Sequence, residues 1–244
     1  AIDCDHARAV VADVEPRSSF LVRPPVANAS CILVAVAVEQ PSFDADQVSR
    51  FLLTAEKTGL QVLLVLTKCD LLDADALSQL RTRLRGWGYE PMLVSTRSGM
   101  GLEELRAQLV TVPISVLCGP SGVGKTSLLN ALLPGLALRV GAVSGRLQRG
   151  RHTTRHVELH AFSPGSRVAD TPGFNRPELP DDVSNLEVLF PELRVQLDQH
   201  PCRFRDCLHR DEPGCGVTRD WERYPLYRKA VEELLEISRP FRAG

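Results

Sequence analysis

The strongest chemical pattern in the chain is a glycine-rich stretch that ends in lysine and threonine. It consists of Gly119, Pro120, Ser121, Gly122, Val123, Gly124, Lys125 and Thr126. The stretch matches G-x-x-x-x-G-K-[ST] in full, with an apolar run before it and a leucine-rich helical pattern after it. Its glycines would let backbone N–H groups surround a β-phosphate, while Lys125 reaches the β- and γ-oxygens and the Thr126 hydroxyl binds Mg²⁺. The pattern predicts a nucleoside triphosphate site at the start of a helix.

A second pattern, Thr67-Lys68-x-Asp70, resembles the [NT]-K-x-D motif with which GTPases select guanine. Asp70 would accept hydrogen bonds from groups of guanine that adenine lacks, so ATP would leave this carboxylate unpaired. The stem of Lys68 would cover the base. Most GTPases have asparagine in place of Thr67, so one hydrogen bond that fastens the loop should differ. Ser95 and Thr96, which end another apolar run, resemble the loop behind the base. The plainer alternative for the four residues is a solvated start of a helix.

A third pattern is Asp-Thr-Pro-Gly at residues 170–173. It resembles the loop in which the aspartate, here Asp170, holds Mg²⁺ through water and the glycine N–H, here of Gly173, meets the γ-phosphate. Asp170 follows Lys125 by 45 residues, which leaves room for a switch segment and two strands. In Ras-like enzymes a glutamine after the glycine orients the attacking water. Phe174 stands there in this chain, so we expect the orienting group to come from elsewhere.

The segment 150–155, between the first and third patterns, is the expected position of switch I. His152 is the candidate for orienting water. Either Thr153 or Thr154 should sense the γ-phosphate and Mg²⁺, and the spacing does not say which. Residues 139–157 contain five arginines, two histidines and no acidic residue. That composition fits either a solvated flexible loop or a loop that binds a phosphate backbone.

The order of these motifs is unusual. Standard GTPases begin with the phosphate loop, whereas here the guanine-selecting loop comes first and the Mg²⁺-binding aspartate last. A rotated order keeps the same site if the former termini are joined and new ones open in a surface loop. The sequence therefore predicts a circularly permuted GTPase. Two alternatives are a P-loop ATPase or kinase, and a GTP-switched RNA-binding module in which hydrolysis is incidental.

Four metal-binding side chains lie within 14 residues near the C-terminus: Cys202, Cys207, His209 and Cys215. Three thiolates and one imidazole make a closed tetrahedral zinc site, with no open position for catalysis. The alternative is that the cysteines are reduced and unliganded. Basic side chains surround the cluster, but acidic ones largely offset them, so charge alone is a weak argument for RNA binding.

The composition is that of an ordinary globular protein: 244 residues, 43% hydrophobic, 24% charged, with a formal net charge of -1. No stretch is long and apolar enough to span a membrane, so we expect no membrane partner. We expect the scattered cysteines to be reduced and buried, which favours the cytosol.

Residues 7–23 predict one strand and an extended linker. Further strands are predicted at 31–38, 62–66, 91–94, 114–117, 155–162 and 167–169, and helices at 44–59, 73–86, 102–109, 125–133 and 224–237. This alternation predicts an α/β fold with a parallel-rich sheet and flanking helices.

With these motifs in hand, the chain resembles the RsgA/YjeQ family of circularly permuted GTPases that depend on the small ribosomal subunit. The resemblance covers nearly the whole chain, including residues 23–28, 119–127, 150–154, 170–174, 190–192 and 202–215. It adds Ser127 to the expected nucleotide-binding positions.

The resemblance implies an N-terminal OB-fold barrel, the permuted GTPase domain and a small helical zinc-binding domain. The expected regions are the end of the barrel and a linker over 1–25, the GTPase domain over 26–178 and the zinc domain over 179–244. Only residues 1–15 could belong to the barrel, about its last strand, so we expect the rest of it to have been removed or left out.

The resemblance also implies the function. It implies a GTP hydrolase that acts in late maturation of the small (30S) ribosomal subunit and is stimulated by that subunit. The implied partners are GTP and GDP, the subunit and its rRNA. The implied cofactors are one structural Zn²⁺ and Mg²⁺ with GTP, and His152 is the implied catalytic residue. We expect a cytoplasmic monomer.

Overall fold

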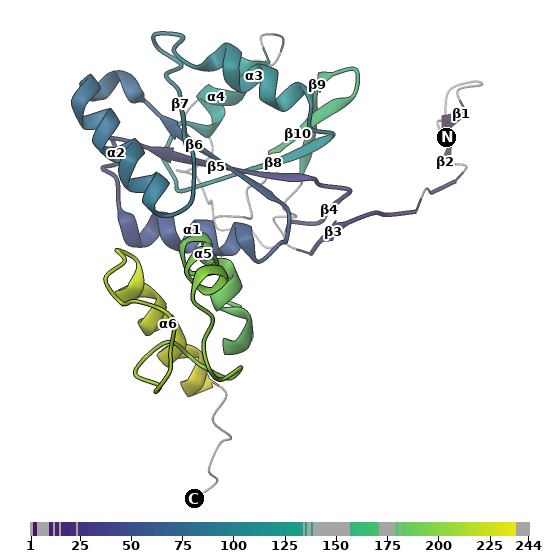
Figure 1. Ribbon diagram of the computed structural model, residues 1–244. Coiled ribbons are helices and arrows are strands. Elements are labelled where there is room, and N and C mark those ends of the chain that lie inside the picture. The colour runs from purple at the N-terminus through teal and green to yellow at the C-terminus, as the bar shows by residue number, and fades with distance from the viewer. Residues whose placement is uncertain are drawn as a thin grey trace, which may run out of the picture.

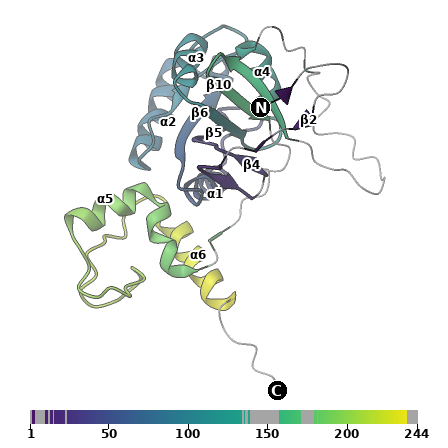
Figure 2. The same cartoon turned by 90° about the vertical axis from the view of Figure 1, so that its right-hand side faces the viewer.

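The computed structural model of the chain (Figure 1) describes residues 2–3, 10–11, 13–14, 16–22, 24–133, 135, 138, 157–170, 179–180 and 182–237. The described residues between 24 and 170 form a sheet with helices on both faces, which we call the sheet region. Residues 182–237 are largely helical, and we call them the C-terminal region. Figures 1 and 2 both show the C-terminal region set against one side of the sheet region.

The sheet has six strands in the order β7-β6-β5-β8-β10-β9. The strands are β5 (Cys31–Ala37), β6 (Gln61–Thr67), β7 (Met92–Leu93), β8 (Ile114–Cys118), β9 (Glu158–Ser163) and β10 (Ser166–Asp170). Neighbours from β7 to β10 pair in parallel, and the edge strand β9 pairs antiparallel with β10. The predicted parallel-rich sheet is confirmed. The antiparallel edge arises because β9 and β10 are joined by a turn too short for a crossover.

Four helices cover the two faces of the sheet. They are α1 (Ala45–Glu56), α2 (Ala74–Gly86), α3 (Leu102–Val110) and α4 (Lys125–Leu132). The central strand β5 is buried along its whole length, and its successive side chains point to opposite faces. Ile32 packs in the core with α1 and α2, and Leu33 packs in the core with α3 and α4. A strand buried on both faces explains the uninterrupted apolar run in the sequence.

Aspartates start the two helices on the first face. The Asp44 carboxylate accepts a hydrogen bond from the backbone N–H of Gln47 at the start of α1. Asp73 accepts from the N–H of Ala76 in the same way at the start of α2. Each carboxylate satisfies a donor that the first helical turn leaves unpaired. Both helices therefore begin one residue after the predicted start.

The C-terminal region has its own apolar core. Its elements are the short helices η2 (Val183–Asn185) and η3 (Glu187–Leu189) and the helices α5 (Pro191–Gln199) and α6 (Tyr224–Ile237). Phe190 packs edge-on against Trp221 and Tyr227, with ring centroids 5.5 and 5.4 Å away. Leu53 of α1 belongs to the same core. The two regions therefore share apolar contacts along α1.

Arg223 forms the buried polar part of the contact between the two regions, which we call the joint. Its side chain is 2% exposed, and it makes a two-point ion pair with Glu192 of α5. Its guanidinium carbon lies 5.0 Å from the Trp87 ring centroid and 4.9 Å from that of Phe190. Trp87 follows α2, so one cation is enclosed by aromatic rings from both regions. Nearby, Glu222 accepts hydrogen bonds from Trp87 Nε1 at 2.8 Å and from Arg83 Nε at 2.6 Å.

The N-terminal residues contain more pairing than predicted. Strand β1 (Ile2–Asp3) pairs with β2 (Val10–Val11), and β3 (Phe20–Leu21) pairs with β4 (Val26–Ala27). The prediction of one strand and an extended linker over 7–23 was therefore incomplete. Asn28 extends the pairing at the open end of the second hairpin. Its side chain accepts from the Ser18 N–H at 2.8 Å, and its own N–H donates to the Ser19 carbonyl at 2.9 Å. Among the described residues, no helix combines the length and apolarity that crossing a bilayer needs.

Candidate nucleotide and metal sites

The three predicted nucleotide motifs meet at one edge of the sheet. Strand β6 ends at Thr67, β8 ends at Cys118 just before the glycine-rich loop, and β10 ends at Asp170. Because these strands are parallel, their carboxyl ends lie at the same edge. The rotated order along the chain thus leads to one site in space.

The glycine-rich loop depends on the absence of side chains. Gly119 has φ 139°, and a Cβ there would lie 2.0 Å from the Ala35 carbonyl oxygen of the adjacent strand β5. Gly122 and Gly124 also have positive φ, at 80° and 94°. This backbone brings the loop tightly over β5 and starts α4 at Lys125. The hydroxyl-bearing Thr126 and Ser127 follow in the first turn of the helix and are half-buried.

Lys125 is held by the loop itself. Its ammonium group donates to the Gly119 and Pro120 carbonyl oxygens at 2.7 and 2.8 Å. Burial lowers the pKa of Lys125, and electrostatic interaction with Cys118 and Asp170 partly opposes that shift. A phosphate that entered the loop would offer this cation a stronger, charge-assisted partner.

Thr67 fastens the predicted guanine-selecting loop to the glycine-rich loop. Its buried hydroxyl lies 2.6 Å from the Val123 carbonyl oxygen and 3.2 Å from that of Val36. Threonine therefore makes the link for which most GTPases use asparagine. Its side chain is shorter, but its hydroxyl still reaches the phosphate loop.

Lys68 adds a second link between the two loops. Its backbone is left-handed, with φ 58°, and its ammonium group donates to the Gly122 carbonyl at 2.8 Å and to the Gln40 carbonyl. The Gln40 contact was missed in the sequence, because any residue has a backbone carbonyl and no side-chain signal marks it. These links place the Lys68 stem beside the phosphate loop.

Asp70 is exposed and already oriented. One of its carboxylate oxygens accepts a hydrogen bond from Ser95 Oγ at 2.5 Å. Ser95 is fully buried and in turn accepts from the backbone N–H groups of Arg97 and Ser98, both at 3.2 Å. Thr96 is exposed beside it. The structure thus brings the two predicted base-binding segments into contact.

Part of the predicted site lies outside the described residues: His152, Thr153, Thr154 and Gly173. Asp170 is described and lies half-buried at the end of β10, close enough to Lys125 to interact electrostatically. The hydroxyl of Thr126 and the carboxylate of Asp170 are oxygen donors of the kind Mg²⁺ prefers.

The four predicted metal ligands come together in the C-terminal region. Their ligand atoms all lie within 4.8 Å of one another. The Cys202 and Cys215 sulfurs are 3.9 Å apart, and His209 Nδ1 lies 3.4 and 3.6 Å from them. A zinc tetrahedron with Zn–S of about 2.3 Å and Zn–N of about 2.0 Å has edges of roughly 3.5–3.8 Å. The donor set and its spacing therefore fit a tetrahedral metal ion.

Carboxylates support this cluster from outside. Glu187 Oε2 lies 2.9 Å from His209 Nε2, so it can accept that proton and leave Nδ1 free to bind metal. Glu212 accepts from the backbone N–H groups of Leu208 and Arg210 at 3.2 and 2.7 Å, which shapes the loop between the ligands. Burial raises the pKa of Cys207 to about 12, opposed by a backbone hydrogen bond. A bound cation would reverse that shift, because it stabilises thiolates.

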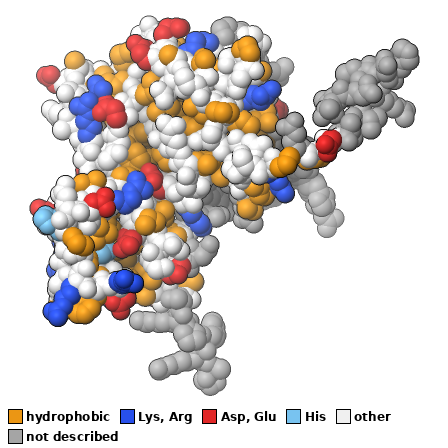
Figure 3. Space-filling model, turned by 45° about the vertical axis from the view of Figure 1, so that its right-hand side comes forward, with side chains coloured by type: hydrophobic (Ala, Val, Ile, Leu, Met, Phe, Trp, Pro, Cys, Tyr) orange, Lys and Arg blue, Asp and Glu red, His pale blue; other side chains and the backbone are white. Residues whose placement is uncertain are grey.

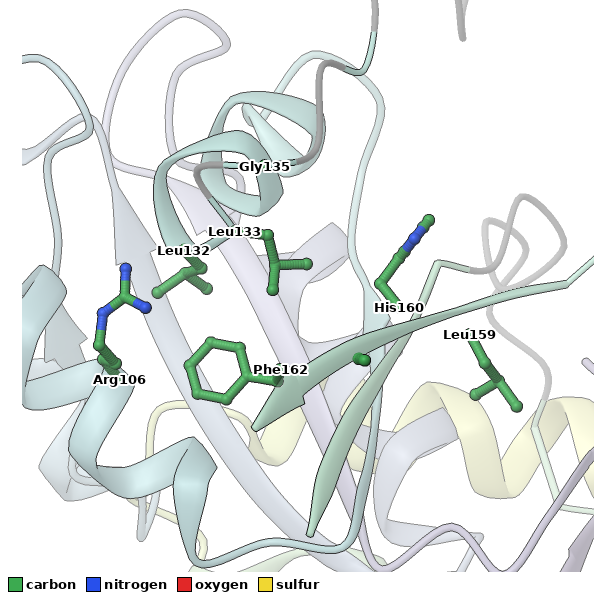
Figure 4. Close-up of a pocket in the computed structure, with 8 residues that line it drawn as sticks. Arg106, Leu132, Leu133, Gly135, Leu159, His160 and Phe162 are labelled. Atoms are coloured by element: carbon green, nitrogen blue, oxygen red, sulfur yellow. The ribbon is translucent and has the colours of Figure 1, made fainter. Parts of the chain in front are cut away.

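A hollow of about 380 Å³ lies apart from both sites. It is at the far end of α4 from the phosphate loop, beside the edge strand β9. Figure 4 shows Leu132, Leu133 and Phe162 gathered next to Arg106, with His160 and Leu159 on the far side. The Arg106 guanidinium lies 5.6 Å from the Phe162 ring centroid and donates to the Ala131 carbonyl at 3.2 Å. This hollow is not part of the predicted nucleotide site.

Comparison with known proteins agrees with this geometry. A family model described as "RsgA GTPase" matches residues 14–180. A relative from Synechococcus sp. (strain CC9311), named "Small ribosomal subunit biogenesis GTPase RsgA", is 75% identical over 244 residues, which is 100% of this chain and 80% of the relative. A relative of the same name from Prochlorococcus marinus (strain MIT 9313) is 64% identical over 100% of this chain and 76% of its own length.

Solved structures show the same fold. YjeQ from Thermotoga maritima superposes with a TM-score of 0.77 at 36% identity, covering 95% of this chain and 80% of that one. YloQ, described as "a circularly permuted GTPase", superposes with a TM-score of 0.73 at 29% identity, covering 98% of this chain and 80% of that one. The family match and the relatives together show that the chain belongs to the RsgA GTPase family of circularly permuted GTPases.

Proposed function

We propose that this chain hydrolyses GTP during biogenesis of the small ribosomal subunit. One observation carries the choice of nucleotide: Asp70, oriented by Ser95 at 2.5 Å, projects from the same sheet edge as the phosphate loop. The ribosomal role is supported by two relatives named "Small ribosomal subunit biogenesis GTPase RsgA". They are 75% and 64% identical to this chain over its whole length.

The described residues suggest how the nucleotide binds. The backbone of 119–124 would surround the β-phosphate, and Lys125 would exchange its two carbonyl partners for β- and γ-oxygens. Asp70 would accept from the guanine edge, and the Lys68 stem would cover the base plane. Bound Mg²⁺ would neutralise the charge that develops on the phosphates, with Thr126 and Asp170 holding it.

Orientation of the attacking water is assigned to His152. Phe174 cannot hydrogen-bond water, and His152 follows the phosphate loop in the segment expected to close over the γ-phosphate. Thr153 or Thr154 would sense that phosphate, and the Gly173 N–H would meet it. His152→Ala should abolish stimulated turnover while leaving GDP affinity intact. His156→Ala, in the same segment, is the matched control and should keep both properties.

The metal cluster is assigned a structural Zn²⁺, bound by Cys202, Cys207, His209 and Cys215. All four positions of the tetrahedron would be filled by protein, so the ion would stabilise the fold and take no part in hydrolysis. The partner of the whole protein would be the small subunit and its rRNA. We expect a monomer, and the cytoplasm as its compartment.

The test is GTP hydrolysis with and without purified small ribosomal subunits, with ATP as the control substrate. The expected result is strong stimulation by subunits that is restricted to GTP. Equal turnover with and without subunits would leave a GTPase and remove the ribosomal role. ATP turnover equal to that of GTP would instead point to a P-loop ATPase and remove the role assigned to Asp70.

Asp70→Asn tests the base selection separately. The amide would present a donor where guanine also presents donors, so GTP affinity should fall by at least about 100-fold. Xanthosine triphosphate, with an oxygen in place of the 2-amino group, should bind this variant better than GTP. Unchanged preference for GTP in the variant would show that another group reads the base.

A further inference from the structure

We propose that the tip formed by Arg203, Phe204 and Arg205 binds an unpaired nucleotide of RNA, with the base stacked on Phe204 and its phosphates on the two arginines. We call these three residues the RFR tip. The proposal rests on the proposed ribosomal function for the source of the RNA, and on the described residues for the chemistry.

The RFR tip carries an exposed aromatic ring. Phe204 is 50% exposed, and both flanking arginines are exposed as well. The core of the C-terminal region already uses Phe190, Trp221 and Tyr227, and Phe204 is not among its members. The ring therefore lies outside that core, between two cations, and is open to a ligand.

The tip stands on a rigid base. It lies between the predicted metal ligands Cys202 and Cys207, so both ends of the loop would be fixed by one ion. The Arg203 N–H donates to the Gly214 carbonyl at 2.9 Å. A Cβ on Gly214 would lie 2.9 Å from Arg203 Cβ and 3.3 Å from its Cδ, so the arginine stem crosses that glycine closely. A binding group that is already ordered loses little entropy when it binds.

The cations of the tip are available to a ligand. The Arg203 guanidinium lies 5.4 Å from the Phe204 ring centroid, and no ion pair to Arg203 or Arg205 occurs within the described part of the chain. Arg219 differs, because it is paired with Asp211 at 2.7 Å. One exposed acid, Asp206, follows the tip, so residues 203–206 contain two arginines and one aspartate and keep a net positive charge.

The combination selects its ligand by chemistry. A nucleobase offers a flat face for the ring, and the adjoining phosphates offer charge to the guanidiniums. A paired helix hides its base faces in the stack, so an unpaired nucleotide is the better fit. An apolar groove on a protein would suit the ring but not two unpaired cations. Among the described residues on the face that Figure 3 shows, Lys and Arg are interspersed with Asp and Glu.

The experiment compares Phe204→Ala, Phe204→Trp and Val195→Ala in the full chain. Val195 is 53% exposed on α5 and serves as the matched control for loss of an exposed apolar side chain. Binding to purified small subunits, in the presence of a non-hydrolysable GTP analogue, is measured beside binding to a single-stranded RNA oligonucleotide and to the same oligonucleotide in duplex form. Metal content and the circular dichroism spectrum of each variant establish that it is folded.

Phe204→Ala should weaken binding to subunits and to single-stranded RNA by about tenfold, because one stacked base is lost. Phe204→Trp should restore it, and Val195→Ala should change it less than about twofold. Unchanged binding by Phe204→Ala would overturn the proposal. So would a loss of subunit binding without any loss of RNA binding, which would assign the tip to a ribosomal protein.

Failure of the proposed function is separable from failure of the tip. If the unmodified chain is not stimulated by subunits but still binds single-stranded RNA through Phe204, the tip stands and the ribosomal role falls. If the chain is stimulated and Phe204→Ala binds equally well, only the tip falls. If the unmodified chain binds neither subunits nor single-stranded RNA, the tip is overturned directly.

Discussion

The nucleotide site and the metal site of this chain are built from different material. The phosphate loop consists of backbone: glycines at positive φ, carbonyls that already hold Lys125, and a close approach of Gly119 to β5. The metal site consists of side chains, with three sulfurs and one imidazole gathered within 4.8 Å. In the first site Lys125 already has two carbonyl partners without a ligand, whereas in the second site burial raises the pKa of the Cys207 thiol, and a bound cation would favour its thiolate. We therefore expect nucleotide binding to be an addition to a folded sheet region, and metal binding to be part of folding the C-terminal region.

Removal of the metal should give the largest difference between the two regions. Structural zinc commonly contributes about 10 kcal/mol to the folding of small domains, and the segment 202–215 that carries the four ligands contains no helix or strand. Cys207→Ser, or treatment with a strong chelator, should unfold residues 182–237 and make them sensitive to protease. GDP binding by the sheet region should persist. Cys31→Ser is the control, because Cys31 is a buried cysteine of strand β5 and not a ligand.

The contrary outcome would be equally informative. Retained protease resistance after complete metal loss would mean that the aromatic core around Phe190 folds this region without an ion. Loss of GDP binding together with the metal would mean that the two regions fold as one unit.

A methyl group in the phosphate loop should have the next largest effect. Gly119→Ala would place Cβ 2.0 Å from the Ala35 carbonyl oxygen at φ 139°, so either the loop or strand β5 must move. We expect a loss of about 3 kcal/mol in the free energy of unfolding, and a fall in GDP affinity of about 100-fold. Denaturant unfolding and titration of a fluorescent GDP analogue measure the two quantities.

Gly165→Ala is the matched control for this change. A Cβ at Gly165, in the turn between β9 and β10, meets no atom within 4 Å. This variant should unfold and bind GDP as the unmodified chain does. If the two alanine variants behaved alike, the close approach to β5 would not be the reason that glycine is required at position 119.

The joint between the regions shows what could not be predicted from the sequence. The strands of the six-stranded sheet, the helices α1 to α4 and α6, and the four metal ligands follow from local patterns and from spacing within 14 residues. The Arg223 cluster depends on Trp87, 136 residues earlier in the chain, and Glu187 joins His209 across 22 residues. The Gln40 carbonyl contact with Lys68 carries no residue-type signal at all. Contacts of this kind depend on how the folded elements approach one another, and no period or motif encodes them.

Removing one partner of the buried ion pair tests how tightly the two regions are joined. Glu192→Gln would leave the Arg223 cation, which is 2% exposed, without a charged partner. Such changes typically cost about 3 kcal/mol. The cost should appear in unfolding of the C-terminal region, measured by denaturant titration. Arg194→Ala is the control, because its ion pair with Glu56, at 3.0 Å, is 45% exposed on the arginine side and should contribute less than about 1 kcal/mol. Equal effects of the two variants would remove the special role of burial at the joint.

The smallest expected effect concerns the hydroxyl that ties the guanine-selecting loop to the phosphate loop. Thr67→Val keeps the shape of the side chain but removes the donor that lies 2.6 Å from the Val123 carbonyl oxygen. A buried acceptor left without a partner costs about 1–2 kcal/mol. Because Val123 belongs to the loop that is expected to surround the phosphates, we expect the loss in GDP affinity, about fivefold to tenfold, to exceed the loss in stability of the chain. Thr67→Ser keeps the hydroxyl and should bind GDP almost normally. A valine variant that lost stability but kept its GDP affinity would show that this hydroxyl serves the sheet alone. The backbone-built site would then be independent of the loop that selects the base.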